Sequence, residues 1–278
     1  SMTAAGLDLN QAFRISQEFE QHLLTEKVHR IEKKDLFQHI KKTIEKQFDT
    51  YTSELYELAS RLDQLKRPVI IYIGGAPGTG KSMLATSLAT RLGINKVIST
   101  DSIREIMRLA FSNDLLPTLF HSTTEAWKGL PMEFQSSEQL IAGYCLQANQ
   151  VSLGVRAVVE RTVEEGENLI VEGAHLVPFL HEIAKKEMVD AYHIPITLSI
   201  MNEKHHRERF SERGTKNLRK IENFYLKRFN EIRSIHEYTL SQCETDEVEV
   251  FDNEDLDETL NLIIQFSIQR LFKQVNSE

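Results

Sequence analysis

The chain of 278 residues has little cysteine, glycine or proline, and it has no long apolar run. Its two cysteines, Cys145 and Cys243, cannot form a disulfide framework, so we expect reduced thiols and a cytoplasmic protein. Twelve glycines and six prolines are too few for a series of linkers or for an all-β protein rich in tight turns. The apolar run at 69–73 is far shorter than the roughly 20 residues that cross a bilayer, and the amino terminus shows no signal-peptide pattern. The sequence therefore predicts neither a membrane partner nor secretion.

Positive charge is also in short supply. The chain has 33 Lys and Arg against 41 Asp and Glu, which gives a net charge of -8. No global positive field is available to attract a phosphate backbone, and this argues against a nucleic-acid partner. The contents of 41% hydrophobic and 27% charged residues are typical of a globular protein with one large domain, alone or with a small companion.

The first quarter of the chain predicts only helices. Apolar residues recur three or four positions apart over 7–24, 35–48 and 53–66, which is the period of an amphipathic helix. Asp35 is a suitable N-cap for the second helix. Arg67 should end the third helix, because a residue before proline is pushed out of the helical conformation. We expect a small all-helical domain over residues 1–66.

After Pro68, short apolar runs alternate with helical stretches. Strands are expected at 69–73, 96–99, 168–171, 194–200 and 248–251, and helices at 81–92, 102–111, 137–164, 202–213, 217–242 and 255–272. Any single short run could also be a piece of buried helix. Five runs in alternation with helices favour an α/β domain over residues 67–278, with a five-stranded parallel sheet and helices on both faces.

A glycine-rich loop directly follows the first expected strand and precedes a helix. Residues 75–82 fit the phosphate-binding pattern G-x-x-x-x-G-K-[ST], and the strand–loop–helix context disfavours an incidental glycine turn. Glycines let successive N–H groups point at phosphate oxygens, Lys81 supplies charge for the β- and γ-phosphates, and the Ser82 hydroxyl can ligate Mg²⁺. The residues expected to bind nucleotide are Gly75, Ala76, Pro77, Gly78, Thr79, Gly80, Lys81, Ser82 and Met83.

Two acidic residues follow neighbouring strands. Asp101 comes after the strand at 96–99, and Glu172 ends the strand at 168–171. Because the carboxyl ends of parallel strands gather at one crevice, both acids should face the γ-phosphate. There Asp101 can accept a proton from an acceptor hydroxyl or hold a metal-bound water, or it can simply cap the next helix. Glu172 can orient Mg²⁺ through water as a Walker-B-type acid, or it can be a solvated residue at a strand end.

A basic cluster lies between residues 204 and 233, where the sequence contains ten Lys and Arg but only four Asp and Glu. In an acidic protein this predicts a mobile lid around 203–220 whose arginines stabilise charge on transferring phosphates. The alternative is a solvated helix face with internal ion pairs, such as Lys204 with Glu208. The lid arginines named by this prediction are Arg207, Arg209 and Arg213.

Three further positions have two interpretations each. His175 can contact the substrate or cap the next segment. Trp127 lies in the stretch 121–127, which can form a wall of the acceptor pocket or pack in a surface loop. The pair Asp252 and Asn253 follows the last strand, where it can flank an adenine base, within a run of acids that we interpret as a solvated edge.

Four stretches of the chain, in this order, resemble the archaeal 2-phosphoglycerate kinase family. They are IGGAPGTGKS at 73–82, VISTDSIRE at 97–105, EGENLIVEGAHLVP at 165–178 and KRFNEIRSIHEY at 227–238. Residues 1–66 resemble the helical part of an ATP-cone, a small nucleotide-sensing domain. An ATP-cone begins with a basic strand segment, and this chain starts after that point. The resemblance implies a P-loop kinase fold and a first domain that does not bind nucleotide on its own.

The resemblance also implies an activity, which is transfer of the γ-phosphoryl group of ATP to the 3-hydroxyl of 2-phosphoglycerate. Carried over by position, Lys81 and Ser82 would handle the triphosphate and Mg²⁺, and Glu172 would support the metal. Asp101 would activate the hydroxyl, with Arg104 near the anionic groups of the acceptor. Arg207, Arg209 and Arg213 would form the lid. The residues by themselves predict an ATP-dependent phosphotransferase with a small anionic acceptor, as a monomer or a homo-oligomer. Alternative acceptors are an inositol phosphate or a nucleotide-sugar, and a non-catalytic nucleotide-regulated binding protein is a further alternative.

Overall fold

The computed structural model describes residues 2–28, 30–131, 136–180, 190–211, 224–246 and 248–277. Two compact units make up the chain. One contains residues 1–66 and 260–278, and the other contains residues 67–259. Residues 260–278, which the sequence led us to expect in the second domain, therefore belong to the helical unit.

The described part of the first unit contains helices, joined by turns and loops, and no strand. Polar caps start two of its helices, because the side chains of Asp8 and Asp49 accept hydrogen bonds from the N–H groups of Gln11 and Thr52. Its apolar core includes Ile15, Phe19, Ile44 and Leu55, each at most 8% exposed. The elements are η1 (Thr3–Ala5), α1 (Leu9–Thr25), α2 (Lys33–Gln47), α3 (Thr50–Ala59), η2 (Leu62–Gln64) and all of α11 (Leu256–Val275) except its first turn.

Two helices of this unit have different bounds from those predicted. Helix α2 begins at Lys33, so Asp35 lies in its first turn, where its carboxylate faces the positive end of the helix dipole. Helix α3 ends at Ala59 rather than at residue 66. The Ser60 hydroxyl donates to the Tyr56 carbonyl at 2.8 Å, which satisfies one of the last carbonyls of the helix, and only the short turn η2 follows.

The second unit is built on five parallel strands in the order β2-β3-β1-β4-β5. Strand β1 is buried along its whole length, as its continuous apolar run predicts for a central strand of a parallel sheet. In the register, Ile71 of β1 pairs with Ile170 of β3 and with Ile194 of β4. The strands are β1 (Val69–Gly74), β2 (Lys96–Ser99), β3 (Leu169–Glu172), β4 (Tyr192–Ser199) and β5 (Glu249–Asp252). The prediction of a five-stranded parallel sheet is confirmed.

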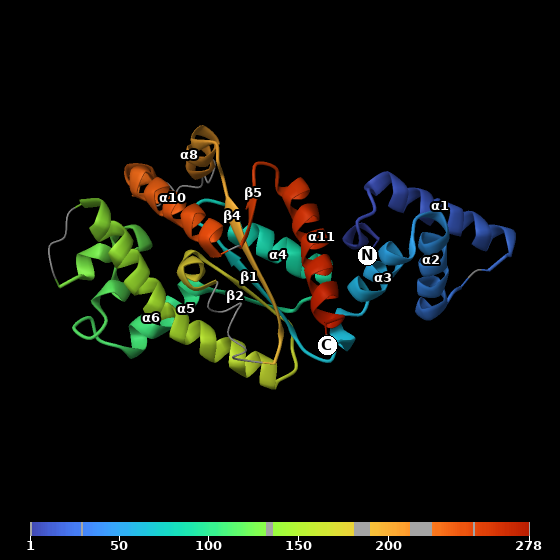
Figure 1. Cartoon of the computed structure of the whole chain (residues 1–278), viewed down its shortest axis with the longest axis horizontal. Helices are drawn as coiled ribbons and strands as arrows, with labels where there is room; N and C mark the ends of the chain where they lie inside the picture. The colour runs from blue at the N-terminus through green and yellow to red at the C-terminus, as the bar shows by residue number, and fades with distance from the viewer. Residues whose placement is uncertain are drawn as a thin grey trace. The chain divides into compact units, whose positions relative to one another are not determined.

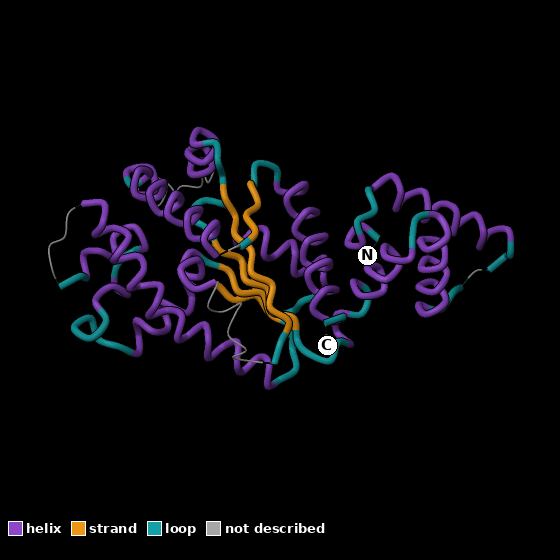
Figure 2. Tube along the Cα trace, in the orientation of Figure 1, coloured by secondary structure: helices purple, strands orange, loops and turns teal. Residues whose placement is uncertain are grey.

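Helices cover both faces of this sheet. Figure 1 shows α4 on one side and α5, α6 and α10 on the other, and Figure 2 shows the strands as one twisted layer between them. The helices are α4 (Lys81–Leu92), α5 (Thr100–Ala110), α6 (Ser136–Glu164), α8 (Glu203–Ser211) and α10 (Phe229–Asp246), with 3-10 turns η3 (Pro117–Phe120), η4 (Thr123–Gly129) and η5 (Ala174–Phe179). This confirms the predicted α/β class. None of the helices in the described residues is both long and apolar enough to span a membrane.

Helix α10 begins later than predicted. The sequence favoured one helix over 217–242, of which residues 212–223 lie outside the described part. Residues 224–227 are helical, and Arg228 forms a turn whose N–H bonds to the Tyr225 carbonyl three positions back. Because a helix needs bonds to the fourth residue back, this turn separates α10 from the segment before it.

The strand order brings the polar strand ends together. Glu172 at the end of β3 is in register with Ser99 of β2 on one side and with Ile73 of β1 on the other. The glycine-rich loop leaves β1 at this level, and α5 leaves β2 there. Since all strands are parallel, this carboxyl edge is where an α/β sheet places its ligands.

Candidate active site

The glycine-rich loop has a backbone that only glycine allows at two positions. Gly78 and Gly80 have φ of 86° and 90°, in the left-handed region. A Cβ atom on Gly78 would collide with the Phe210 ring, and one on Gly80 would lie 2.6 Å from Nδ2 of Asn253. The loop therefore keeps its curl with other groups packed closely against it.

Three carbonyls of the loop are held by side chains. Lys81 Nζ donates to the Ala76 carbonyl at 2.7 Å, His206 Nε2 to the Pro77 carbonyl at 2.9 Å, and Asn253 Nδ2 to the Thr79 carbonyl at 2.8 Å. Burial lowers the pKa of His206 to about 4, so the imidazole is neutral at pH 7. A loop whose carbonyls are held in this way is preorganised to receive phosphate on its amides and on Lys81.

Two oxygen-bearing side chains face one another beside the loop. Ser82, in the first turn of α4, donates its hydroxyl to Oε1 of Glu172 at 2.9 Å. Glu172 is only 6% exposed, whereas Ser82 is exposed. Hydroxyl and carboxylate oxygens are ligands that Mg²⁺ accepts, and the pair fits a metal held mainly by phosphates and water. Within the described ranges there is no cluster of three or more His, Cys, Asp or Glu that would hold a metal by itself.

Asp101 lies in the first turn of α5 without capping it. The N-cap is Ser99, whose hydroxyl accepts from the Ser102 N–H at 3.1 Å. The interpretation of Asp101 as the cap is therefore wrong, because the helix begins two residues earlier than predicted. The Asp101 side chain is 72% exposed, and its Oδ1 lies 3.7 Å from Nε of Arg104. A carboxylate in this position is available to a ligand.

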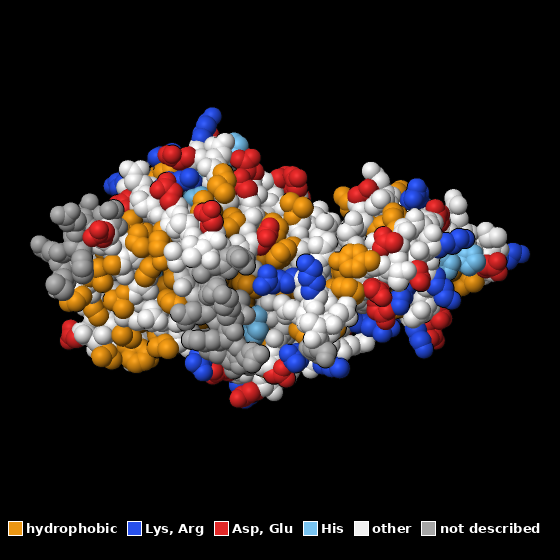
Figure 3. Space-filling view, viewed as in Figure 1, with side chains coloured by type: hydrophobic (Ala, Val, Ile, Leu, Met, Phe, Trp, Pro, Cys, Tyr) orange, Lys and Arg blue, Asp and Glu red, His pale blue; other side chains and the backbone are white. Residues whose placement is uncertain are grey.

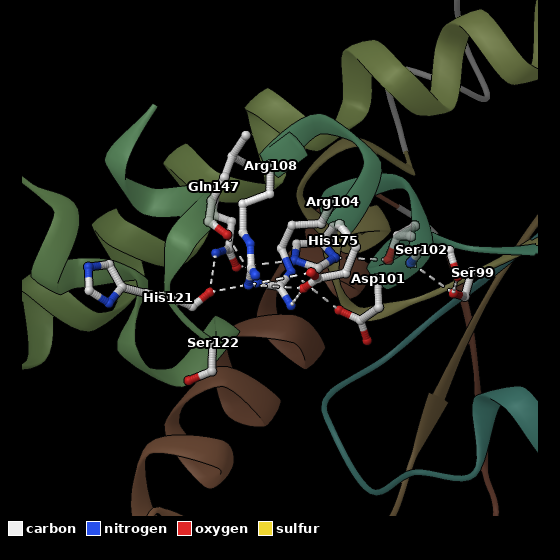
Figure 4. Close-up of polar contacts among 12 residues, drawn as sticks. Ser99, Asp101, Ser102, Arg104, Arg108, His121, Ser122, Gln147 and His175 are labelled. Carbon is white, nitrogen blue, oxygen red and sulfur yellow. Dashed lines mark hydrogen bonds and ion pairs between the residues drawn. The ribbon is translucent and has the colours of Figure 1, made fainter. Parts of the chain in front are cut away.

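Arg104 is held from behind by the protein. Its Nη1 donates to the carbonyls of Leu119 and His121 at 3.1 and 2.8 Å, and its Nη2 donates to Glu105 at 2.8 Å. Its Nε is buried and has no hydrogen-bond partner among the described residues. Figure 4 shows Arg104 beside Asp101, with His121 on its far side. The guanidinium is thus fixed in place and still presents positive charge to Asp101 and to the space beyond.

These groups line one cavity of about 260 Å³. It brings together five residues that the sequence singled out from three separate segments: Lys81, Ser82, Asp101, Arg104 and Glu172. The rest of its wall includes a run of hydroxyl side chains and two aromatic rings, namely Ser122, Thr123, Thr124, Phe210 and Tyr225.

A second cavity, of about 570 Å³, shares the loop glycines Gly78 and Gly80 with the first. Met83 and Asn253, both predicted to lie near the nucleotide, line it together with Arg209. Arg209 donates to the Asn253 carbonyl and, at 3.1 Å, to the Glu254 carbonyl. The loop thus has a polar cavity on its Lys81 side and a wider cavity reaching to the residues that follow β5.

Of the two other predicted lid arginines, only Arg207 lies among the described residues. Arg207 lies on α8 with its guanidinium 4.1 Å from the centre of the Phe229 ring and 3.7 Å from Glu203. Arg213, with the part of the predicted lid from residue 212 onward, lies outside the described residues. The alternative ion pair of Lys204 with Glu208 is present at 3.8 Å between exposed side chains. On the face in Figure 3, basic and acidic side chains are intermixed.

Trp127 and His175 lie behind the cavity walls. Trp127 is half-buried against an apolar cluster that contains Ala76 and Tyr144. His175 is 2% exposed and hydrogen-bonds to two buried side chains, Thr100 and Gln147. Neither residue lines the cavity that contains Asp101.

Several wall residues were not identified from the sequence. Tyr225 packs against the apolar cluster that contains Phe210, and both rings also line the cavity. Aromatic residues give the same pattern in a core and in a pocket wall, so only the tertiary structure separates the two. The run from Ser122 to Thr124 did carry a signal, because three consecutive hydroxyl residues in an irregular segment are typical of a polar wall.

The chain is similar to known proteins along most of its length. A family model described as an AAA domain matches residues 71–230, more than half of the chain. The 2-phosphoglycerate kinase of Methanopyrus kandleri is 36% identical over 276 residues, covering 98% of this chain and 83% of the relative. The 2-phosphoglycerate kinase of Methanocaldococcus jannaschii is 37% identical over 279 residues, covering 100% and 88%. A solved gluconokinase from Sinorhizobium meliloti 1021 is 14% identical, with a TM-score of 0.45 over 76% of this chain and 98% of that chain. The chain belongs to the 2-phosphoglycerate kinase family.

Proposed function

We propose that this protein transfers the γ-phosphoryl group of ATP to the 3-hydroxyl of 2-phosphoglycerate, giving ADP and 2,3-bisphosphoglycerate. The observation that carries the proposal is the single cavity in which Lys81 and Ser82 of the phosphate loop meet Asp101 and Arg104 of α5. Membership of the 2-phosphoglycerate kinase family supports the choice of acceptor.

The nucleotide would extend over both cavities. Its phosphates would bind the loop amides and Lys81, whose side chain is nearly buried and already points along the loop. Its base would enter the second cavity, between Arg209 and the residues from Asn253 onward. An arginine guanidinium stacks favourably on a flat π-system, which suits an adenine at that position.

Ser82 and Glu172 would hold Mg²⁺, the Ser82 hydroxyl directly and Glu172 directly or through water. When bound, the metal neutralises negative charge on the β- and γ-phosphates. The hydrogen bond between the two side chains already orients both oxygens toward the same side of the loop.

The acceptor hydroxyl would be activated by Asp101. Its exposed carboxylate accepts the hydroxyl proton, the acceptor oxygen bonds to the γ-phosphorus, and the bond from that phosphorus to the bridging oxygen breaks. ADP leaves with the bond electrons, and Asp101 later releases its proton to water. Lys81 stabilises the charge that moves onto the leaving phosphate.

The acceptor carries a carboxylate and a phosphate, and the cavity has matching groups. Arg104 supplies positive charge next to Asp101, and the hydroxyls of Ser122, Thr123 and Thr124 supply hydrogen-bond donors on the facing wall. A neutral sugar would offer no anionic group to Arg104, whose buried Nε has no hydrogen-bond partner among the described residues, and this disfavours it.

A product assay tests the proposal directly. Purified protein with MgATP is incubated with 2-phosphoglycerate, 3-phosphoglycerate, glycerate or an inositol phosphate, and ADP release is followed with ³¹P NMR of the product. We expect turnover with 2-phosphoglycerate and a product with two phosphomonoester signals. Turnover with an inositol phosphate alone would change the acceptor, and no stimulation by any acceptor would favour a nucleotide-regulated binding protein.

A further inference from the structure

A chain of buried hydrogen bonds runs behind the cavity that contains Asp101. Oγ1 of Thr100 lies 2.8 Å from Nδ1 of His175, and Nε2 of His175 lies 3.1 Å from Oε1 of Gln147. Nε2 of Gln147 donates to the carbonyls of Thr118 and His121 at 2.5 and 3.0 Å. Thr100, Gln147 and His175 are each at most 2% exposed. This series of hydrogen bonds is therefore sealed from water, and each bond in it depends on its neighbours.

The two carbonyl partners of Gln147 set the direction of every bond. Both carbonyls are acceptors only, so the amide NH₂ of Gln147 must face them and its Oε1 must face His175. His175 therefore carries its proton on Nε2, and its bare Nδ1 accepts from the Thr100 hydroxyl. Burial lowers the pKa of His175 to about 4, which keeps this neutral form at physiological pH.

The two ends of this series of hydrogen bonds hold opposite walls of the cavity. Thr100 directly precedes Asp101 in the first turn of α5. The His121 carbonyl directly precedes the hydroxyl run that starts at Ser122, and it also accepts from Arg104. Figure 4 shows His175 beside Arg104, and Gln147 joined by a drawn bond to the His121 carbonyl. Arg104 also links these two walls, and Ile103 of α5 shares an apolar cluster with Leu119 and Phe120.

The turn after β3 is also pressed against Thr100. Gly173 has φ of 152°, and a Cβ atom there would overlap Oγ1 of Thr100. The backbone between Glu172 and His175 can therefore approach Thr100 only because residue 173 is glycine. This close approach lets the imidazole of His175, in η5, bridge α5 and α6.

We propose that His175 is a positioning residue that sets the distance between the Asp101 carboxylate and the hydroxyl wall at 122–124. The inference rests on the proposed function, because it assumes an acceptor held between these two walls. An apolar side chain would fill the same space without fixing either wall, and misplacement of reacting groups by about 1 Å costs roughly 10²-fold in rate. His175 acts through Thr100 and Gln147 and touches no reactant.

Kinetics of matched variants test this role. Thr100→Val keeps the shape but removes the donor, Thr100→Ser keeps the donor, and Gln147→Leu removes the other end. We expect Thr100→Val and Gln147→Leu to lower kcat by about 10- to 100-fold with the KM for ATP within about twofold, and Thr100→Ser to restore most of kcat. Thr162→Val is the control, because this buried hydroxyl donates only to the Val158 carbonyl of its own helix.

The double variant separates positioning from packing. If a single series of hydrogen bonds connects the two walls, the double variant Thr100→Val with Gln147→Leu should be no slower than the slower single variant. Either change alone already breaks the series. A double variant whose loss equals the product of the two single losses would overturn the proposal. So would Thr100→Val with wild-type kcat.

A second measurement does not depend on the acceptor. Imidazole ¹⁵N NMR of the full chain should show His175 neutral with the proton on Nε2 from pH 8 down to pH 5. A proton on Nδ1 of His175, or titration of His175 near pH 6.5, would overturn the proposed positioning role whatever the substrate is. Failure of the wild type to use 2-phosphoglycerate would instead overturn the proposed function, and the kinetic tests would then use the acceptor that gives turnover.

Discussion

The hydroxyl of Ser82 donates to the carboxylate of Glu172 at 2.9 Å, although the two residues are 90 positions apart in the chain. Ser82 lies in the first turn of the helix after the phosphate loop, and Glu172 ends the neighbouring strand β3. Because β1 and β3 are adjacent and in register, this contact forms at the carboxyl edge of the sheet. It marks the place where a metal would join the loop to the sheet.

Removing the charge of Glu172 should weaken metal binding. In Glu172→Gln the Ser82 hydroxyl keeps an acceptor, but the negative charge is lost. We expect the Mg²⁺ concentration for half-maximal turnover to rise about 10–100-fold, as measured by metal titration of the initial rate. Glu167→Gln is the control, since Glu167 pairs with Lys96 at 2.6 Å just before β3 begins. Equal metal dependence in Glu172→Gln and wild type would exclude Glu172 from the site.

Asp101→Asn should separate chemistry from nucleotide binding. The amide keeps the size of the side chain but cannot accept the hydroxyl proton, so kcat should fall by about 10²–10⁴-fold while the KM for ATP stays within about twofold. Steady-state kinetics with saturating acceptor give both constants. Asp114→Asn, in the exposed turn after α5, is the matched control. Retention of wild-type kcat in Asp101→Asn would show that another group takes the proton.

Gly78→Ala should damage the phosphate loop. The new methyl group would meet the Phe210 ring at a φ of 86°, and such strain costs roughly 1–3 kcal/mol, or about 5- to 140-fold in nucleotide affinity. Calorimetric titration with ADP measures the change. Gly93→Ala is the control, because Gly93 has φ of 71° at the end of α4 with nothing within 4 Å of its Cβ position. It should lower stability by about 1 kcal/mol and leave ADP affinity unchanged. Similar affinities for the two variants would mean that the loop relaxes around the methyl group.

Three buried histidines should make the fold sensitive to mild acid. Burial lowers the pKa of His175 and His206 to about 4 and that of His236 to about 3, from 6.5 in the unfolded chain. Below pH 6.5 the unfolded chain therefore binds more protons than the folded one. The free energy of unfolding should be highest above pH 6.5, where these histidines are neutral in both states. Below that pH it should fall by up to about 1.4 kcal/mol per histidine for each pH unit, down to about pH 4. Urea unfolding at pH 7.5 and pH 5 measures the loss, and equal free energies at both values would contradict it.

Local patterns were sufficient for much of the fold. The apolar run of β1, the loop from Gly75 to Ser82 and the helix α4 were predictable because each depends on neighbouring residues and on the φ that glycine permits. Asp101 and Glu172 could be placed at the same edge because parallel strands end on one side. The helix bounds failed where caps decided them. Ser99 rather than Asp101 caps α5, and this depends on which oxygen reaches an N–H group.

Long-range relations were not predictable in the same way. The sequence left His175 as a substrate contact or a cap, whereas it is buried between Thr100 and Gln147. Tyr225 packs against an apolar cluster and also lines the cavity, and no local pattern shows that it does both. Residues 260–278 continue a helix that starts in the α/β unit, and yet they belong to the helical one.

The amino-acid sequence by itself determined the class of fold, the phosphate loop and the set of charged groups available for chemistry, since these follow from periodicity, glycine conformation and residue type. Only the tertiary structure decided which of those groups meet and which are sealed away. The order β2-β3-β1 brings Ser82 to Glu172, and the packing of α5 and α6 encloses His175. Such contacts depend on distances between segments far apart in the chain, and no local pattern encodes those distances.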